Sequence, residues 1–184
     1  EAAVYPDLEA PATVVSLNNA QLGAEINARI VEIAPRVGDT VAQGEVVARL
    51  DCTDYELALR RAEAVLQGAE ARRNLARAQL GRAQSLVTRQ NISRELLNQR
   101  EADVRTLQAE YEVQRVAVST ARRDTEKCAL HAPFNGVVLE RLGQVGETAS
   151  LGKPLLRVLD LDHIEVSAQV DVDLAERLQR AQAL

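Results

Sequence analysis

The 184-residue sequence predicts an α+β protein in which a small β-sandwich is split by a long antiparallel helical hairpin. Two observations carry this prediction. A β-type segment occurs twice, at residues 27–50 and 135–158, and the residues between the copies have the heptad spacing of a coiled coil. If the two copies close into one body, the segment between them has to leave that body and return to it.

The internal repeat has an offset of 108 residues, and seven of its positions are identical in both copies. Five of the identical pairs are Val37/Val145, Gly38/Gly146, Thr40/Thr148, Gly44/Gly152 and Arg49/Arg157. In each copy, short runs of β-forming residues are interrupted by two glycines six residues apart, which predicts strand, tight turn and strand. Glycine suits such turns because it adopts positive φ without strain. Two copies of one β unit predict a sandwich with pseudo-twofold symmetry.

Between the copies, apolar residues recur at alternating spacings of three and four, which predicts two helices with heptad seams. The first seam is Leu59, Ala62, Leu66, Ala69, Arg73, Ala76, Leu80, Ala83 and Val87, with Arg73 as its polar interruption. The second seam is Leu97, Val104, Leu107, Tyr111, Gln114, Val118, Ala121 and Thr125. The pattern breaks at residues 88–93, where we expect the chain to turn back. Helices of about 33 residues would each be roughly 50 Å long.

The ends of the predicted helices carry capping signals. Thr53 and Glu56 have the spacing of a capping box, in which each side chain accepts a backbone N–H of the other. Ser93 is expected to cap the second helix, and Glu95 is favourable in its first turn.

Composition and motifs exclude several classes of function. A net charge of −5 argues against a nucleic-acid partner, and no run of 18 apolar residues would span a membrane. The only histidines, His131 and His163, have no cluster of Cys or His around them that could complete a zinc site. No Ser/His/Asp arrangement, phosphate-binding glycine loop or catalytic pair of carboxylates is present. We therefore predict no catalytic, cofactor or metal site, and no enzyme activity.

Specific motifs connect these features to a known family. The segments VGDTVAQGEVVARLDCTDYE and CALHAPFNGVVLERLGQVGETASLGKPLLRVLDL, with the long hairpin between them, resemble the HlyD/RND-type periplasmic adaptors, also called membrane fusion proteins. The run APFNGVV followed by GE is among the most specific marks of that family, and the resemblance extends from about Thr13 to Leu178. It implies that the two β halves form a lipoyl-like barrel-sandwich hybrid, followed by part of a β-barrel domain.

The resemblance also implies a division of the chain. Its parts are an N-terminal strand of the partial β-barrel at 1–15, lipoyl-like half 1 at 16–52, the hairpin at 53–127 with its tip at about 88–93, half 2 at 128–162, and the first strand and short helix of the β-barrel at 163–184. Because the chain begins at Glu1, without Met or an export signal, we expect it to be part of a longer protein whose signal or lipid anchor has been removed.

The function implied by the resemblance is that of a periplasmic adaptor associated with the inner membrane. Such an adaptor links an inner-membrane transporter, here expected to be of the RND efflux type, to a TolC-type outer-membrane channel, and assembles as a homo-oligomer, a trimer or hexamer in the pump. Arg82, Leu86 and Ser93 reproduce the R-x3-L-x6-S spacing of hairpin tips that dock to such channels. The alternative is a local role, in which Leu86 closes the seam, Ser93 caps the second helix and Arg82 is solvated.

The two cysteines, Cys52 and Cys128, lie at the two feet of the predicted hairpin. They are either two buried thiols that act as small apolar residues or a disulfide, which an oxidising periplasm permits. We favour the disulfide, because antiparallel helices have to come together at this point.

Other readings of the chain remain as alternatives. A type I secretion or ABC-type efflux adaptor has the same architecture. A lipoyl or biotinyl carrier requires a lysine on an exposed turn between the two halves, and neither Lys127 nor Lys153 matches that position. A free-standing coiled coil is disfavoured by the flanking β repeat.

Overall fold

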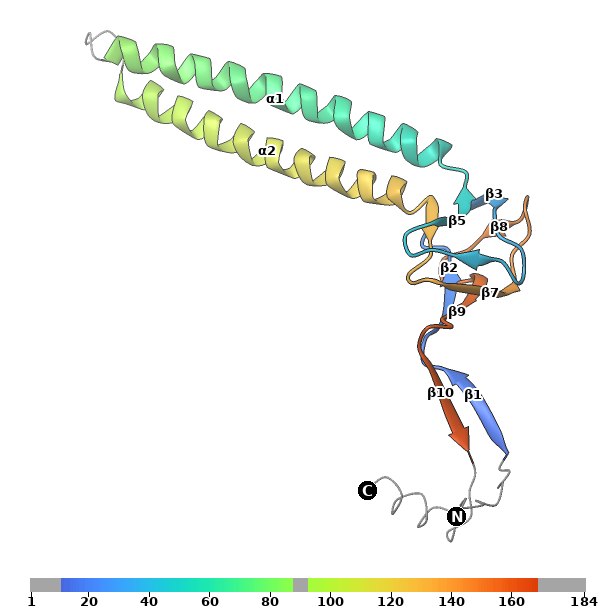
Figure 1. Ribbon diagram of the computed structural model, residues 1–184. Helices are drawn as coiled ribbons and strands as arrows, with labels where there is room; N and C mark the ends of the chain where they lie inside the picture. The colour runs from blue at the N-terminus through green and yellow to red at the C-terminus, as the bar shows by residue number, and fades with distance from the viewer. Residues whose placement is uncertain (1–10, 88–92, 169–184) are drawn as a thin grey trace, which may run out of the picture.

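The computed structural model describes residues 11–87 and 93–168, which form a β body, a helical hairpin and a two-stranded arm (Figure 1). Helices α1 (Thr53–Val87) and α2 (Arg94–Glu126) project together from the body. The arm leaves the body in another direction and pairs β1 (Ala12–Ser16) with β10 (Ile164–Ala168). The predicted α+β class and the split of the β body by a hairpin are confirmed.

The β body consists of two four-stranded sheets, with strand orders β2-β9-β7-β4 and β6-β5-β3-β8. The strands are β2 (Asn19–Gly23), β3 (Ala28–Ile33), β4 (Thr40–Val41), β5 (Val46–Leu50), β6 (Ala129–His131), β7 (Gly136–Arg141), β8 (Thr148–Ala149) and β9 (Pro154–Leu159). Their largest fully buried side chains are aliphatic: Ile30, Val47, Val138, Leu155, Leu156 and Val158. Each sheet contains strands from both repeat copies, so neither half forms a complete sheet alone.

The repeat is visible in the hydrogen bonds. The Gly38 N–H donates to the carbonyl of Val138 at 2.9 Å, and the equivalent Gly146 N–H donates to the carbonyl of Ile30 at 2.8 Å. Gly38 and Gly146 have φ values of 92° and 93°, as the predicted tight turns require. The short strand of each copy thus pairs with the first strand of the other, in the pairs β3–β8 and β4–β7. The predicted pseudo-twofold symmetry is confirmed.

Side-chain contacts explain other identical positions of the repeat. The amide oxygen of Asn135 accepts the Gln43 N–H at 2.7 Å, and that of Asn27 accepts the Leu151 N–H at 2.9 Å. Two ion pairs are also related by the repeat, Arg49–Glu32 at 3.5 Å and Arg157–Glu140 at 2.9 Å. The residues that are identical in the two copies therefore stabilise equivalent turns and cross-strand pairs in both halves.

The helices of the hairpin are antiparallel and meet along the predicted seams. Ala69, Ala76 and Ala83 of α1 and Val118 of α2 are buried, and the other seam residues from 59 to 83 and from 97 to 125 are half-buried. The side chain of Val87 lies outside the described residues. Contacts across the hairpin run in opposite directions along the two helices: Glu63–Arg122, Arg72–Glu110, Arg77–Gln108 and Gln79–Arg100.

The polar interruption of the seam has its own partners. The guanidinium carbon of Arg73 lies 4.0 Å from the ring centroid of Tyr111, a seam residue of α2. An Arg73 guanidinium nitrogen also lies 3.0 Å from a carboxylate oxygen of Glu70. The Glu70 pair lies within α1 and is independent of register, whereas the stacking on Tyr111 forms only in this alignment and so helps to fix how the two helices align.

One helix cap is as expected and the other is different. The Ser93 hydroxyl oxygen accepts the Leu96 N–H at 3.3 Å, which confirms the cap of α2. The predicted Thr53/Glu56 capping box is wrong. The Thr53 hydroxyl instead donates to the Asp51 carboxylate at 2.7 Å, and the Glu56 N–H donates to the carbonyl of Cys52 at 2.9 Å. Because α1 already begins at Thr53, it is the Asp51 carboxylate rather than the Thr53 hydroxyl that accepts an N–H at the start of the helix, that of Thr53 at 3.1 Å.

Residues at both ends of the described chain meet in the arm, as the resemblance implied. The register of β1 and β10 runs from Ala12 opposite Ala168 to Ser16 opposite Ile164. The expected short helix after this strand lies outside the described residues, as do residues 88–92 of the expected tip.

Replacing Gly136 with alanine tests the close approach of β7 and β9 within one sheet. A Cβ atom at this position would collide with the backbone carbonyl of Leu159 on the neighbouring strand, so we expect G136A to lower the free energy of unfolding by about 2 kcal/mol. Gly81 is the matched control, because a Cβ there has no neighbour within 4 Å. G81A should stabilise α1 by about 1 kcal/mol. Urea unfolding measures both, and a neutral G136A would contradict the packing described here.

Candidate functional site

The three predicted docking residues lie at the end of the hairpin farthest from the β body (Figure 1). Arg82 and Leu86 are one turn apart near the end of α1, so they lie on the same side of that helix. Leu86 is 40% exposed, and Arg82 is exposed. Ser93 precedes α2, and its hydroxyl oxygen is occupied by the cap described above. The tip therefore offers one guanidinium and one aliphatic side chain side by side.

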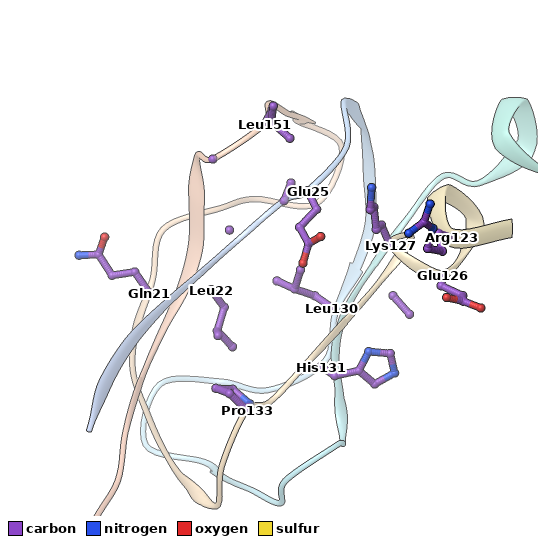
Figure 2. Close-up of a pocket in the computed structure, with 14 residues that line it drawn as sticks. Gln21, Leu22, Glu25, Arg123, Glu126, Lys127, Leu130, His131, Pro133 and Leu151 are labelled. Carbon is purple, nitrogen blue, oxygen red and sulfur yellow. The ribbon is translucent and has the colours of Figure 1, made fainter. Parts of the chain in front are cut away.

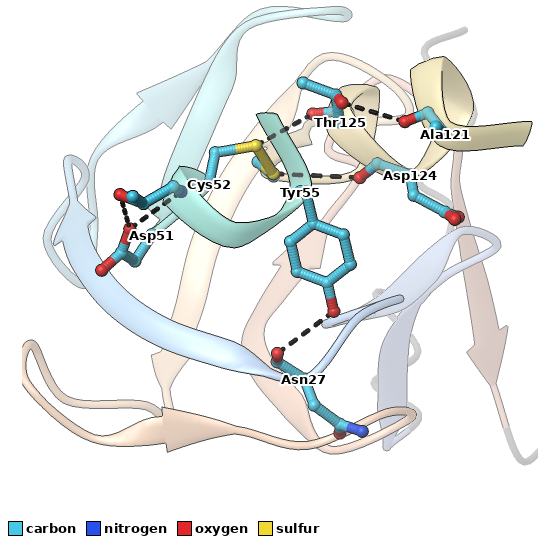
Figure 3. Close-up of a disulfide and its surroundings, with 9 residues drawn as sticks. Asn27, Asp51, Cys52, Tyr55, Ala121, Asp124 and Thr125 are labelled. Atoms are coloured by element: carbon cyan, nitrogen blue, oxygen red, sulfur yellow. Dashed lines mark hydrogen bonds between the residues drawn. A yellow bond between two sulfur atoms is a disulfide. The ribbon is translucent and has the colours of Figure 1, made fainter. Parts of the chain in front are cut away.

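The base of the hairpin is closed by a disulfide (Figure 3). The sulfur atoms of Cys52 and Cys128 are 1.98 Å apart, and their Cα atoms are separated by 5.7 Å. Cys52 directly precedes α1, and Cys128 lies between α2 and β6. The Leu50 N–H also donates to the carbonyl of Cys128 at 2.7 Å. A covalent bond and a backbone hydrogen bond thus join the two feet of the hairpin.

Further contacts tie the first turn of α1 to the β body. The Tyr55 hydroxyl donates to the carbonyl of Asn27 at 3.2 Å (Figure 3), and the Asp51 N–H donates to the carbonyl of Arg29 at 2.8 Å. The hydroxyl and the N–H of Thr53 both donate to the Asp51 carboxylate and lower its pKa below the ordinary 3.8, with a smaller effect from the charge of Arg29. The hairpin is therefore fixed to the body rather than hinged on two single strands.

A groove of about 860 Å³ lies beside this base, between β2, β6 and the last turn of α2 (Figure 2). Leu22, Leu130 and Pro133 give it an apolar part. Its charged lining residues are Glu25, Arg123, Glu126, Lys127 and His131. Among the residues that the structure describes, no group of three His, Cys, Asp or Glu side chains could hold a metal ion. The groove has no arrangement of nucleophile and base that would support catalysis.

The two lysines lie away from the position that a swinging arm would need. Lys127 caps the C-terminal end of α2, and Lys153 follows the turn between β8 and β9. The connection between the two β halves is the hairpin itself. Neither lysine therefore occupies the turn between the two halves that a lipoyl or biotinyl carrier uses.

A second joint connects the β body to the arm, and sequence reasoning missed it. The side chain of Asp160 is buried and accepts the amide of Asn18 at 2.8 Å and the N–H of Asp162 at 2.8 Å. The His163 ring Nδ1 lies 2.8 Å from the same carboxylate. The Asn18 hydrogen bond is the largest of several effects that lower the pKa of Asp160 to about 2. Nothing in its spacing distinguishes Asp160 from the other acidic residues, because its partners come together only in the fold.

The family model of the CzcB-like, barrel-sandwich hybrid domain matches residues 18–160. The chain belongs to this family. The matched range contains the whole β body and the hairpin, so the lipoyl-like barrel-sandwich hybrid inferred from the resemblance is confirmed. No helix in the described part of the chain has an apolar stretch long enough to cross a membrane.

Curated relatives are similar over most of the chain. The nodulation protein NolF of Rhizobium meliloti is 27% identical over 86% of this chain and 43% of its own length. The macrolide export protein MacA of Yersinia pestis is 26% identical over 84% of this chain and 46% of its own length. This chain therefore spans less than half the length of these relatives.

A solved structure shows the same fold. The membrane fusion protein Spr0693 of Streptococcus pneumoniae superposes with a TM-score of 0.63 at 16% identity, over 89% of this chain and 69% of that one. The fold of a β body with a projecting hairpin is thus shared with this solved structure.

Removing the disulfide should weaken the closure of the hairpin. Because Cys52 and Cys128 are 76 residues apart, the double variant C52S/C128S should lose about 4 kcal/mol of unfolding free energy in the chain-entropy model. Urea unfolding with and without reductant measures this loss. Intact mass before and after reduction and alkylation is the control, and two free thiols in air-purified protein would contradict the bond.

Acid should loosen the joint at Asp160. Its pKa falls from 3.8 to about 2 on folding, so its contribution to stability is complete above pH 3.8 and is lost as the pH falls towards 2. We expect the melting temperature of D160N to be lower than wild type at neutral pH, and the difference to shrink between pH 4 and pH 2. The exposed neighbour Asp162 provides the control, D162N, which should have the same melting temperature as wild type at each pH. A difference in melting temperature between D160N and wild type that stays the same at every pH would contradict this role.

Proposed function

We propose that this chain is the central part of a periplasmic adaptor that links an inner-membrane transporter, of the RND efflux type, to a TolC-type outer-membrane channel. The observation that carries the proposal is the hairpin, a spike of two helices fixed to its β body by a disulfide and by hydrogen bonds. Membership of the barrel-sandwich hybrid family and the similarity to an export protein and a membrane fusion protein support it.

The tip is the proposed contact with the channel. Arg82 offers guanidinium donors to carbonyl or carboxylate groups, Leu86 offers an apolar contact, and Ser93 lies where the second helix begins. The cap made by Ser93 and a docking role are compatible, because the hydroxyl that accepts the Leu96 N–H can still donate its proton. A hairpin whose two helices are already packed together also loses less conformational entropy on binding than a flexible one.

The mechanism is assembly rather than chemistry. Copies of the chain form a homo-oligomer, a trimer or hexamer in the complete pump, that encloses a conduit between the two membranes. The arm of β1 and β10 leads away from the hairpin, and the parts of the protein beyond it contact the transporter. No step requires a metal, a cofactor or a catalytic residue.

Site-specific crosslinking tests the tip. A photo-crosslinking residue at position 82 or 93 should capture a co-expressed TolC-type channel, whereas the same residue at position 60 or 67, at exposed places nearer the base, should not. We expect R82A to weaken channel affinity about tenfold, as loss of an interface arginine commonly does. R60A is the matched control, since Arg60 is an exposed arginine of the same helix. Crosslinks from positions 60 and 67 but none from 82 and 93 would reject the tip assignment.

A further inference from the structure

The surroundings of the two sulfur atoms at the base of the hairpin suit two redox states (Figure 3). The Sγ of Cys52 lies 3.6 Å from the carbonyl oxygen of Thr125, and the Sγ of Cys128 lies 3.8 Å from that of Asp124. Both carbonyls belong to the last turn of α2, whose C=O groups have no partner within the helix. Neither sulfur has a proton to donate while the disulfide is closed. Once the bond is opened, each thiol has a hydrogen-bond acceptor already in reach.

The backbone at the base does not depend on the sulfur atoms. The residues on either side of Cys52 are held by the β body, through the hydrogen bonds of Asp51 and Tyr55 described above. Cys128 leads directly into β6, which pairs with β5. Opening the disulfide therefore leaves both cysteines in place, and neither thiol is left without a partner.

The two cysteines differ in exposure. Cys128 is 8% exposed and belongs to the core of the β body, whereas Cys52 is half-buried at the edge of that core, directly before α1. A reagent from solvent therefore reaches the Sγ of Cys52 first. Thiol–disulfide exchange proceeds through a mixed disulfide on the attacked sulfur, so the difference in exposure decides which cysteine carries it.

We propose that the disulfide of Cys52 and Cys128 is a reversible exchange site, opened by dithiols and closed by disulfides, with Cys52 as the residue that forms the mixed disulfide. A thiolate of the dithiol attacks the Sγ of Cys52, the bond to Cys128 breaks, and the Cys128 sulfur leaves with the electron pair and takes up a proton. The second thiolate of the reagent then displaces the Cys52 sulfur, which is protonated in turn. Two electrons pass to the protein, and the dithiol becomes a disulfide. Closure by a disulfide reagent is the reverse of these steps.

Opening the bond changes how firmly the two feet of the hairpin are joined. In the closed form a covalent bond joins them. In the open form the sulfur atoms contribute only a weak S–H···O hydrogen bond between the feet, from Cys52 to Thr125. A helix of 35 residues is about 50 Å long, so a tilt of about 5° at its foot moves its tip by about 4 Å. The redox state of the base therefore sets how precisely the tip is held, and this consequence rests on the proposed function.

Exchange on the folded chain is the first test. Native protein is incubated with dithiothreitol in the absence of denaturant, alkylated with iodoacetamide and weighed intact, while circular dichroism follows the helices. Both thiols should become alkylated without loss of the helix signal, and oxidised glutathione should restore the disulfide in reduced protein that has not been alkylated. The proposal is overturned if the bond opens only in denaturant, or if the reduced chain loses its helices where the oxidised chain keeps them.

The single variants C52S and C128S assign the attacked sulfur, and each is the matched control of the other because it keeps one cysteine in the same fold. With oxidised glutathione, reduced C128S should form its mixed disulfide at least about tenfold faster than reduced C52S, because buried thiols react slowly. Intact mass over time measures both rates, and circular dichroism checks that both variants are folded. Equal rates, or a faster reaction of C52S, would reject the assignment of Cys52.

Amide hydrogen exchange measures the effect on the hairpin. Reduction should speed exchange about tenfold at the two feet, residues 57–62 and 122–127, and leave the middle of the seam unchanged. C52S/C128S is the control, because it should exchange like reduced wild type whether or not dithiothreitol is present. Identical exchange at the feet of the oxidised and reduced chains would contradict the loosening of the base. No channel or transporter takes part in these measurements, so their failure is distinct from a failure of the tip crosslinks.

Discussion

The exchange of short strands between the two repeat copies is the constraint on which the rest of the structure depends. Because β3 pairs with β8 and β4 with β7, neither copy can complete a sheet without the other. Closure of the body also places β5 beside β6, with Arg49 opposite Ala129. The helical insert therefore begins and ends on neighbouring strands, and its two helices have to run side by side. The hairpin is a topological consequence of the β body.

Stiffness of the spike arises at three levels. Small residues such as Ala69, Ala76 and Ala83 are buried in the seam and allow the helix axes to approach closely. The stacking of Arg73 on Tyr111 disfavours alternative registers, since in another alignment Arg73 would lose the Tyr111 ring. At the base, the disulfide of Cys52 and Cys128 prevents the two feet from separating. A projection built in this way can hold its tip at a defined distance from the body.

The β body acts as a junction between two projections. The hairpin is joined to it through the disulfide and Tyr55, and the arm is joined through the buried carboxylate of Asp160. Both joints use interactions between residues far apart in sequence. The β body therefore orients each projection, rather than the chain segments that lead into it. For a protein proposed to connect two partners, a rigid junction of this kind transmits position from one end to the other. The remainder of the longer relatives would extend from the arm.

The sequence by itself determined the features that repeat or have a regular period. The offset of 108 residues predicted the twofold body, because equal sequences form equal turns at Gly38 and Gly146. The heptads predicted the seam and the antiparallel hairpin, because apolar residues at this spacing can be buried only against another helix. Ser93 was predicted as a cap from local chemistry alone, and the structure places its hydroxyl on the Leu96 N–H.

Only the tertiary structure decided the contacts that join distant segments. Thr53 had the sequence of a capping box, but α1 already begins at Thr53, and the Asp51 carboxylate accepts both its N–H and its hydroxyl proton. Asp160 has no distinguishing spacing, since Asn18 comes from the other end of the chain. A periodic pattern reports which residues are buried, whereas the partners of a polar group depend on the three-dimensional path of the whole chain.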